Sequence, residues 1–162
     1  MIRGASAHKN SLRFRAIRRI EILMPDQRAD FPWICATSAD QLVATDTPHL
    51  FATTSTAVSF VSSVIIPGQT PCLRCLHLHR CDQDPGWPMI DLQVSHNPIV
   101  DSASITLILN TAMEVVRAVC AWVDQVETRG SQVLELGNGL DSVETYPTFF
   151  HPSCGCRWDK TA

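Results

Sequence analysis

Two closely spaced pairs of cysteines constrain the fold of this chain more than any other feature of its sequence. Cys72 and Cys75 are separated by two residues, and Cys154 and Cys156 are separated only by Gly155. Two thiolates at either spacing can bind one tetrahedral ion from a short turn, and glycine gives a one-residue spacer the backbone freedom it needs. The four sulfurs predict a closed, structural zinc site that ties the middle of the chain to its end.

The remaining cysteines and histidines leave a second ligand set open. Seven cysteines are an odd number, and in a reducing compartment metal binding explains them better than a complete disulfide framework. Histidines near the pairs are expected more often at the surface or beside the ligands than in the metal shell; they are His77, His79, His96 and His151. Cys81 follows Arg80, which could lower the pKa of its thiol, although an ordinary loop thiol is the simpler interpretation.

Composition and charge favour an ordinary soluble domain. The chain has 162 residues, 45% of them hydrophobic, and a formal net charge of -3, which gives no overall attraction to nucleic acid or membrane. Basic residues in the first 20 positions break up any apolar run that could serve as a secretory signal. Charged residues also interrupt the most apolar stretch, Ile99–Val123. We therefore expect a cytoplasmic protein with no membrane span.

Residue types predict two pairs of strands. Thr, Val, Phe and Ile dominate His49–Ile66, which predicts a β-hairpin with its turn in the polar cluster Thr53–Thr56. Pro67-Gly68 then ends the second strand. The second pair is expected at Gln132–Leu136 and Ser142–Tyr146, joined by a turn at Gly137–Gly139.

One long helix is predicted from apolar residues at three- and four-residue spacings. It is expected to begin after Asp101 or Ser102 and to end before Gly130. Its apolar face, which we expect to lie in the core, consists of Ile105, Ile108, Leu109, Ala112, Met113, Val116, Val119, Cys120 and Val123. Cys120 is interpreted as core filling, and the opposite side carries Thr106, Asn110, Glu114 and Arg117.

Two further segments are predicted from composition. An apolar run, Phe31–Ala36, precedes Ser38–Val43, which can cap and start a short helix. Residues 81 to 101 are rich in Asp, Pro and Asn, and we expect an irregular crossover loop there.

Several segments, taken in order, resemble the C-terminal half of the ThiF/MoeB/HesA family, relatives of ubiquitin-activating enzymes. They are Pro48–Phe51, Pro67–Cys75, Ala112–Glu114 and Cys154–Cys156. Leu76–Arg80 together with Asp84–Pro88 looks most like actinobacterial ThiF-type proteins, including those associated with maturation of ribosomally made, modified peptides. The resemblance implies an α/β fold, namely a partial Rossmann-like ThiF domain with a mainly antiparallel C-terminal sheet, one long helix and the four-cysteine zinc site.

The family adenylates the C-terminal carboxylate of a small protein or peptide, using ATP and magnesium. It holds the phosphates on a glycine-rich turn after its first strand, and no G-x-G-x-x-G occurs in this sequence. Thr37 stands where the family usually places a metal-binding aspartate, and Val94 stands at the crossover-loop cysteine of some members; Cys81 lies earlier. We therefore expect ATP and magnesium only if another chain or a longer product completes the fold, and we assign no catalytic residue.

The resemblance divides the chain into a basic N-terminal segment, 1–29, the C-terminal portion of a ThiF-type domain, 30–158, and a tail, 159–162. The leading hypothesis is that the chain contributes the zinc-stapled, acceptor-binding half of an adenylating protein, with a carrier protein or precursor peptide as partner and a possible homo- or heterodimer. The alternatives are a truncated remnant and a non-catalytic module that holds a peptide against the exposed hairpin. A nucleic-acid binder is disfavoured because the chain beyond its basic start is acidic.

Overall fold

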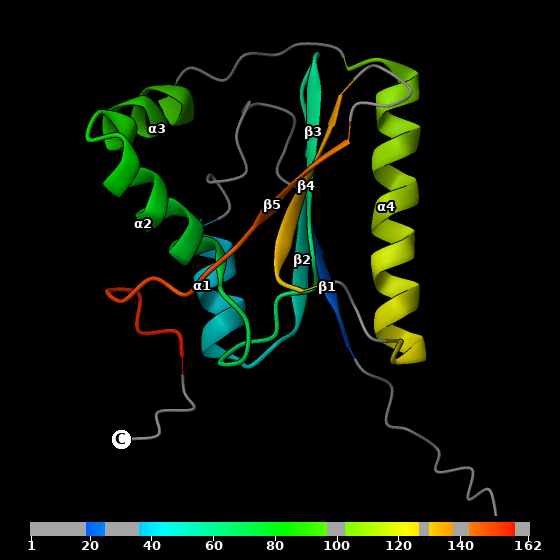
Figure 1. Ribbon diagram of the computed structural model, residues 1–162, viewed down its shortest axis with the longest axis horizontal. Helices are drawn as coiled ribbons and strands as arrows, with labels where there is room; N and C mark the ends of the chain where they lie inside the picture. The colour runs from blue at the N-terminus through cyan, green and yellow to red at the C-terminus, as the bar shows by residue number, and fades with distance from the viewer. Residues whose placement is uncertain (1–18, 25–35, 97–102, 127–129, 138–142, 158–162) are drawn as a thin grey trace, which may run out of the picture.

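The computed structural model describes residues 19–24, 36–96, 103–126, 130–137 and 143–157, and in them one sheet lies between two layers of helices. The strands, in both chain and sheet order, are β1 (Glu21–Leu23), β2 (His49–Thr54), β3 (Val58–Ser62), β4 (Gln132–Gly137) and β5 (Val143–Pro147). The helices are α1 (Ala36–Ala44), α2 (Leu73–Gln83), α3 (Trp87–His96) and α4 (Ile105–Asp124). In Figure 1, α1, α2 and α3 lie on one side of the sheet and α4 lies on the other.

The sheet is mixed and mainly antiparallel, as expected. β1 pairs parallel with β2, and every later neighbouring pair is antiparallel. The predicted hairpin is confirmed as β2 and β3, but its turn lies at 55–57, because Thr53 and Thr54 still belong to β2. The expectation that this hairpin is exposed is wrong: β1 and β4 flank it, and nearly all of β2 is buried. The exposed edge strand is β5.

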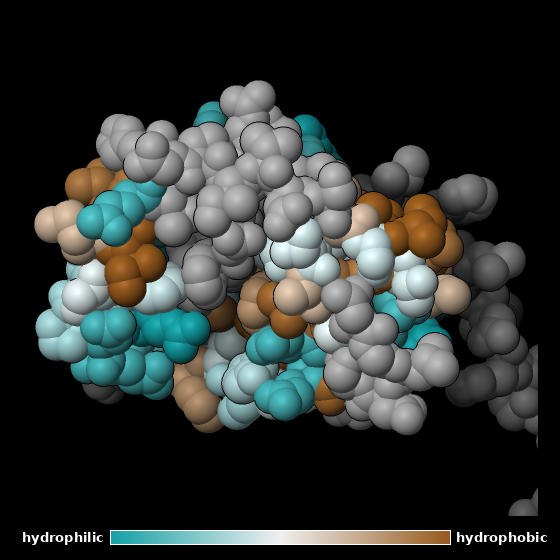
Figure 2. All heavy atoms as spheres, turned by 90° about the horizontal axis from the view of Figure 1, so that it is seen from above, coloured by the Kyte–Doolittle hydropathy of each residue, from teal (hydrophilic) through white to brown (hydrophobic). Residues whose placement is uncertain are grey.

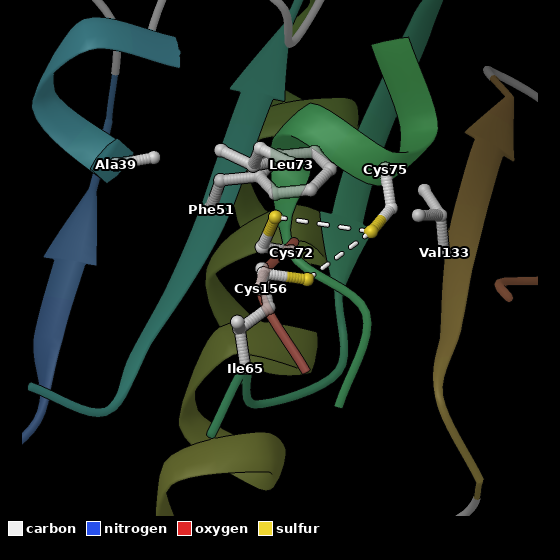
Figure 3. Close-up of a cluster of buried hydrophobic side chains, with 8 residues drawn as sticks. All are labelled: Ala39, Phe51, Ile65, Cys72, Leu73, Cys75, Val133 and Cys156. Atoms are coloured by element: carbon white, nitrogen blue, oxygen red, sulfur yellow. Dashed lines mark hydrogen bonds between the residues drawn. The ribbon is translucent and has the colours of Figure 1, made fainter. Parts of the chain in front are cut away.

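The two faces of the sheet bury different cores, because successive side chains of a strand point to opposite faces. Phe51 of β2 packs with Ala39 of α1 and Leu73 of α2. The neighbouring residue, Ala52, packs with Leu107 of α4 on the other face. Three of the cysteines predicted to bind zinc, Cys72, Cys75 and Cys156, belong to the first core, which joins the cysteine cluster to the sheet (Figure 3).

The prediction of an irregular crossover loop at 81–101 is wrong for the described residues, 81–96. Helix α2 continues to Gln83, and α3 begins at Trp87. The side chain of Asp84 accepts a hydrogen bond from the Gly86 N–H at 2.8 Å, which closes a short turn between the helices. Pro88 falls in the first turn of α3, where its missing N–H breaks no helical hydrogen bond. The Asp, Pro and Gly residues therefore form a helix junction.

The long helix is confirmed, but its ends differ from the prediction. The Ser104 hydroxyl, not Asp101 or Ser102, caps its start by accepting a hydrogen bond from the Leu107 N–H at 3.2 Å. Gln125 ends the helix in the left-handed conformation, with φ at 53°, well before Gly130. The short helix α1 and the pairing of β4 with β5 are also confirmed, whereas Phe31–Cys35 and residues 138–142 lie outside the described residues.

The predicted orientation of α4 is wrong. The residues it turns toward the sheet include Leu107, which is 0% exposed, and Thr111, which is 4% exposed. Most of the expected core face is exposed instead, including Cys120, which is therefore not core filling. We call this exposed surface the α4 stripe, and it consists of Ile105, Ile108, Leu109, Ala112, Met113, Val116, Cys120 and Val123.

Candidate metal centre

The first cysteine pair lies at the start of α2. Cys72 is the N-cap residue, and the Cys75 N–H in the first helical turn donates to the Cys72 carbonyl at 3.0 Å. The pair is thus presented by a helical turn rather than by an isolated knuckle. A helix N-terminus carries a positive partial charge, so this position favours the thiolate form that metal binding requires.

The second cysteine pair lies in a turn close to the end of the described chain. The Cys154 N–H donates to the His151 carbonyl at 3.0 Å, and Gly155 then adopts a φ of 71°. Few residues other than glycine adopt this conformation without strain, and it lets Cys154 and Cys156 turn toward the same point. An isolated bridge between Gly68 and Arg157 holds this turn beside the segment that leads into α2.

The four sulfurs converge on one point between these segments. One distance, Cys72 Sγ to Cys154 Sγ, is 3.4 Å, and another, Cys75 Sγ to Cys156 Sγ, is 3.3 Å. All four sulfurs lie within 4.8 Å of one another. A tetrahedral zinc with bonds of about 2.3 Å places its sulfurs about 3.8 Å apart, so the four residues fit this ion with small adjustments.

The cluster is largely shielded from water, which favours neutral thiols when no cation is present. The hydrogen bond from Cys72 to Cys75 lowers the pKa of Cys75 to about 4. The same hydrogen bond is the main cause that raises the pKa of Cys72, and burial raises it further. Burial is the main cause that raises the pKa of Cys154 to about 12. A divalent cation would supply the positive charge that four thiolates need.

His151 supports the centre without acting as a ligand. A backbone hydrogen bond from His151 reaches the Cys75 sulfur and lowers the pKa of that thiol. The His151 ring accepts the Ser153 N–H at Nδ1 (3.1 Å), so Nε2 carries the ring proton and donates to Asp82 Oδ2 (2.9 Å). This hydrogen bond links the second cysteine turn to the last turn of α2. The sequence did not identify Asp82, because only the folded chain brings it to His151.

His79 completes a second group of potential ligands with Asp82 and His151, and one ligand atom of each lies within 4.8 Å of the others. The His79 and His151 rings meet edge to face, with centroids 4.8 Å apart. Both His151 nitrogens are already engaged, however, and a protonated Nε2 offers no lone pair to a metal. This second group, which differs from the set that the sequence left open by including Asp82, is therefore a weaker candidate than the four sulfurs.

Cys81 does not belong to the group of four converging sulfurs. Burial, and then the charges of Asp82 and Asp91, raise the pKa of Cys81, contrary to the reactive alternative. The Arg80 guanidinium lies over the Trp87 ring, 5.0 Å from its centroid. Thr37 and Val94 fall in α1 and α3, and the side chains at both positions and at His96 lie outside the described residues, as does Cys35.

A pocket of about 410 Å³ lies next to the cysteine cluster, between α2 and the last two strands. Its apolar walls include Leu76, which directly follows Cys75 in the chain. Polar groups come from His79 and Arg80 of α2 and from Glu135 of β4. The rim includes Tyr146, Pro147, Thr148 and Phe149, so the pocket opens beside the edge strand β5.

Sequence comparison identifies no relative, because no protein-family model and no curated protein matches this chain. Solved structures match its fold at low identity. Escherichia coli MccB with MccA superposes with a TM-score of 0.61 and 12% identity, over 85% of this chain and 38% of that one. MccB with ATP gives a TM-score of 0.59 and 12% identity, over 86% of this chain and 39% of that one.

A heterocyclase in complex with substrate and cofactor also matches, with a TM-score of 0.58 and 15% identity, over 85% of this chain and 20% of that one. At these identities the likeness shows the fold alone. This chain spans about two fifths of MccB and a fifth of the heterocyclase. The expected α/β fold with a four-cysteine cluster is confirmed as a partial MccB-like fold.

Proposed function

We propose that this chain is the acceptor-binding part of a ThiF-type adenylating protein and that zinc at the four cysteines fixes its structure. The observation that carries the proposal is the convergence of Cys72, Cys75, Cys154 and Cys156 within a partial MccB-like fold. Bound zinc would cross-link α2 to the C-terminal turn. Four thiolates leave no open coordination position, so the proposed role of zinc is structural.

ATP and magnesium belong, in this proposal, to a second polypeptide or to a longer product. MccB, solved with ATP, is more than twice as long as the part this chain covers. β1 is a short strand at the edge of the described sheet and pairs with β2 in parallel, which is the strand arrangement of nucleotide-binding α/β sheets. Further parallel strands could therefore continue the sheet at β1.

The acceptor is proposed to bind in the pocket beside the metal centre. An extended peptide can add to the exposed edge of β5 through main-chain hydrogen bonds, while the pocket receives one or two side chains. Arg80 offers the cation that a C-terminal carboxylate requires, and its contact with Trp87 restricts the guanidinium before binding. The ligand class is thus a small protein or peptide with a free C-terminus.

Fluorescence anisotropy with labelled peptides of the intended precursor, with free or amidated C-termini, tests this proposal. Arg80→Ala should weaken binding of the free acid about tenfold or more, because hydrogen bonds to charged groups contribute about 1.5 to 3 kcal/mol. It should leave the amidated peptide nearly unchanged. Arg74→Ala is the matched control, since Arg74 is exposed on the same helix and does not line the pocket. Equal losses for both peptides would contradict the assignment of Arg80.

A second candidate function, peptide binding without adenylation, is favoured by the missing glycine-rich turn. ATP–pyrophosphate exchange separates the two candidates when the chain, the peptide and a candidate nucleotide-binding polypeptide are combined. Exchange that requires all three components supports the adenylating assignment. The assay requires that the nucleotide-binding polypeptide binds ATP and associates with this chain. If the peptide then binds and no exchange occurs, the result supports the binding module.

A further inference from the structure

The pocket beside the cysteine cluster has walls of opposite charge. Arg80 of α2 lies on one wall, and Glu135 of β4 lies on the other. Within the described residues no ion pair includes either side chain, and Arg80 lies over the Trp87 ring instead. Hydrophobic and hydrophilic side chains mix on the side of α2 and α3, at the left of Figure 2. The positions of the charges are therefore more informative about a ligand than the general composition of this surface.

A second carboxylate lies directly opposite Glu135 in the sheet. Glu144 of β5 is the antiparallel partner of Glu135, so the two side chains point to the same face. Phe60 of β3 pairs with Glu135 from the other side and lines the pocket, so this face is the one on which the pocket opens. Like charges directly opposite each other destabilise a sheet. An arrangement that costs stability is expected where a ligand uses it.

Tyr146 does not neutralise the two carboxylates. Its hydroxyl donates a hydrogen bond to Glu144 Oε2 at 2.5 Å. This hydrogen bond is the main cause that raises the pKa of Tyr146 to about 12, and Glu135 adds to the shift. A hydroxyl has one proton to donate, so it cannot serve both carboxylates at once. Two negative charges therefore remain beside an aromatic ring, and this combination of groups favours a cation.

The open edge of β5 indicates how a ligand would bring a cation to this place. β5 is the last strand of the described sheet, and all of its residues are exposed. A peptide strand added at this edge would place one side chain beside Glu144 and, two residues away, another beside Tyr146. Tyr146 is itself paired with Val133, an apolar residue of the pocket wall. The first position therefore suits a basic side chain and the second an apolar one.

We propose that the acceptor carries an arginine or lysine close to its C-terminus and that Glu135 and Glu144 bind this side chain while Arg80 binds the terminal carboxylate. The inference rests on the acceptor site of the proposed function and specifies its ligand. Arginine suits the site better than lysine, because a planar guanidinium can bridge two carboxylates and stack on Tyr146. Two contacts of opposite charge would also fix the direction in which the peptide lies.

Fluorescence anisotropy with short labelled peptides tests this proposal. Each peptide has a free C-terminus and carries one arginine, glutamine or glutamate, moved in turn along its last residues. The best-placed arginine peptide should bind the wild type about tenfold more tightly than its glutamine counterpart, because hydrogen bonds to charged groups are strong. Glu135→Gln and Glu144→Gln should each remove most of this preference and leave the glutamine peptide unchanged. Asp124→Asn, which removes one exposed charge at the end of α4, is the matched control and should keep the preference.

The glutamine variants should fold, because they keep the shape of glutamate and relieve the repulsion between the strands. Circular dichroism and thermal unfolding verify this. Glu135→Lys combined with Glu144→Lys reverses the charges and should make the glutamate peptide bind more tightly than the arginine peptide.

Two outcomes overturn the inference. Equal affinities of the arginine and glutamine peptides, while Arg80→Ala still weakens binding of the free acid, overturn the inference alone and leave the proposed acceptor site in place. A preference for arginine that persists in both glutamine variants also overturns it, since the cation would then bind elsewhere. Precursor peptides with free and amidated C-termini test the acceptor site separately.

Discussion

The two faces of the sheet are built in different ways. On the cysteine face, Phe51 and Leu73 are almost completely buried, and four converging sulfurs close the layer. On the α4 face, the described core is smaller and consists of Ala52, Val61, Leu107 and Leu136, and a pocket of about 250 Å³ remains between α4 and the sheet. The cysteine cluster and a dense core lie on one face, whereas the helix on the opposite face leaves much of its apolar surface exposed.

The largest expected effect comes from removing a sulfur. Cys75→Ser should abolish stable metal binding and loosen the cysteine face, because structural zinc contributes on the order of 10 kcal/mol of folding free energy in small sites. Elemental analysis and thermal unfolding measure the loss. Cys120→Ser on the α4 stripe is the matched control and should change neither the metal content nor the unfolding temperature. A similar loss in both variants would contradict the difference between the two faces.

A comparison of the two cores should show the next largest effect. Phe51→Ala should lower the free energy of unfolding by about 3 to 5 kcal/mol, because a large cavity opens in a dense core. Leu107→Ala should cost less, at about 2 to 3 kcal/mol, because the core around Leu107 contains fewer buried residues than the core around Phe51. Chemical denaturation of both variants measures the difference. A greater cost for Leu107→Ala would reverse the proposed ranking of the two cores.

Gly155→Ala should have a smaller effect on the cysteine face. An added Cβ meets no atom within 4 Å, so the expected cost of about 1 kcal/mol comes from the φ of 71° alone. Metal affinity should fall by about tenfold or less, which competition with a chelator can measure. Gly130→Ala is the control, because its Cβ also meets nothing and its φ is not positive. Equal metal affinities of the wild type, Gly155→Ala and Gly130→Ala would contradict the role assigned to the turn at Gly155.

The smallest effect is expected at the start of α4. Ser104→Ala removes the hydroxyl that accepts the Leu107 N–H and should cost about 1 kcal/mol. Native-state hydrogen exchange should show faster exchange in the first turn of α4 and unchanged protection in α2. Faster exchange in both helices would mean that the two faces do not respond independently.

The sequence predicted the features that depend on local spacing. The cysteine pairs, the hairpin and the long helix were visible because each has a characteristic residue pattern. The helix junction at Asp84–Trp87 was not, since Asp, Pro and Gly serve helix ends as well as loops.

The orientation of α4 could not be obtained from periodicity. A 3.6-residue pattern identifies an apolar face but not the surface that covers it. In the fold, Leu107 and Thr111 face the sheet through a narrower side of the helix, while the wider apolar side is exposed. The Asp82–His151 hydrogen bond could not be predicted from the sequence either, because it joins residues that lie far apart in the chain.

Zinc X-ray absorption combined with elemental analysis of the purified chain tests the central claim most directly. The account predicts one zinc ion per chain with four sulfur neighbours at about 2.3 Å. Purified protein that holds no zinc while all four thiols react freely, or a zinc shell containing histidine nitrogen, would contradict it.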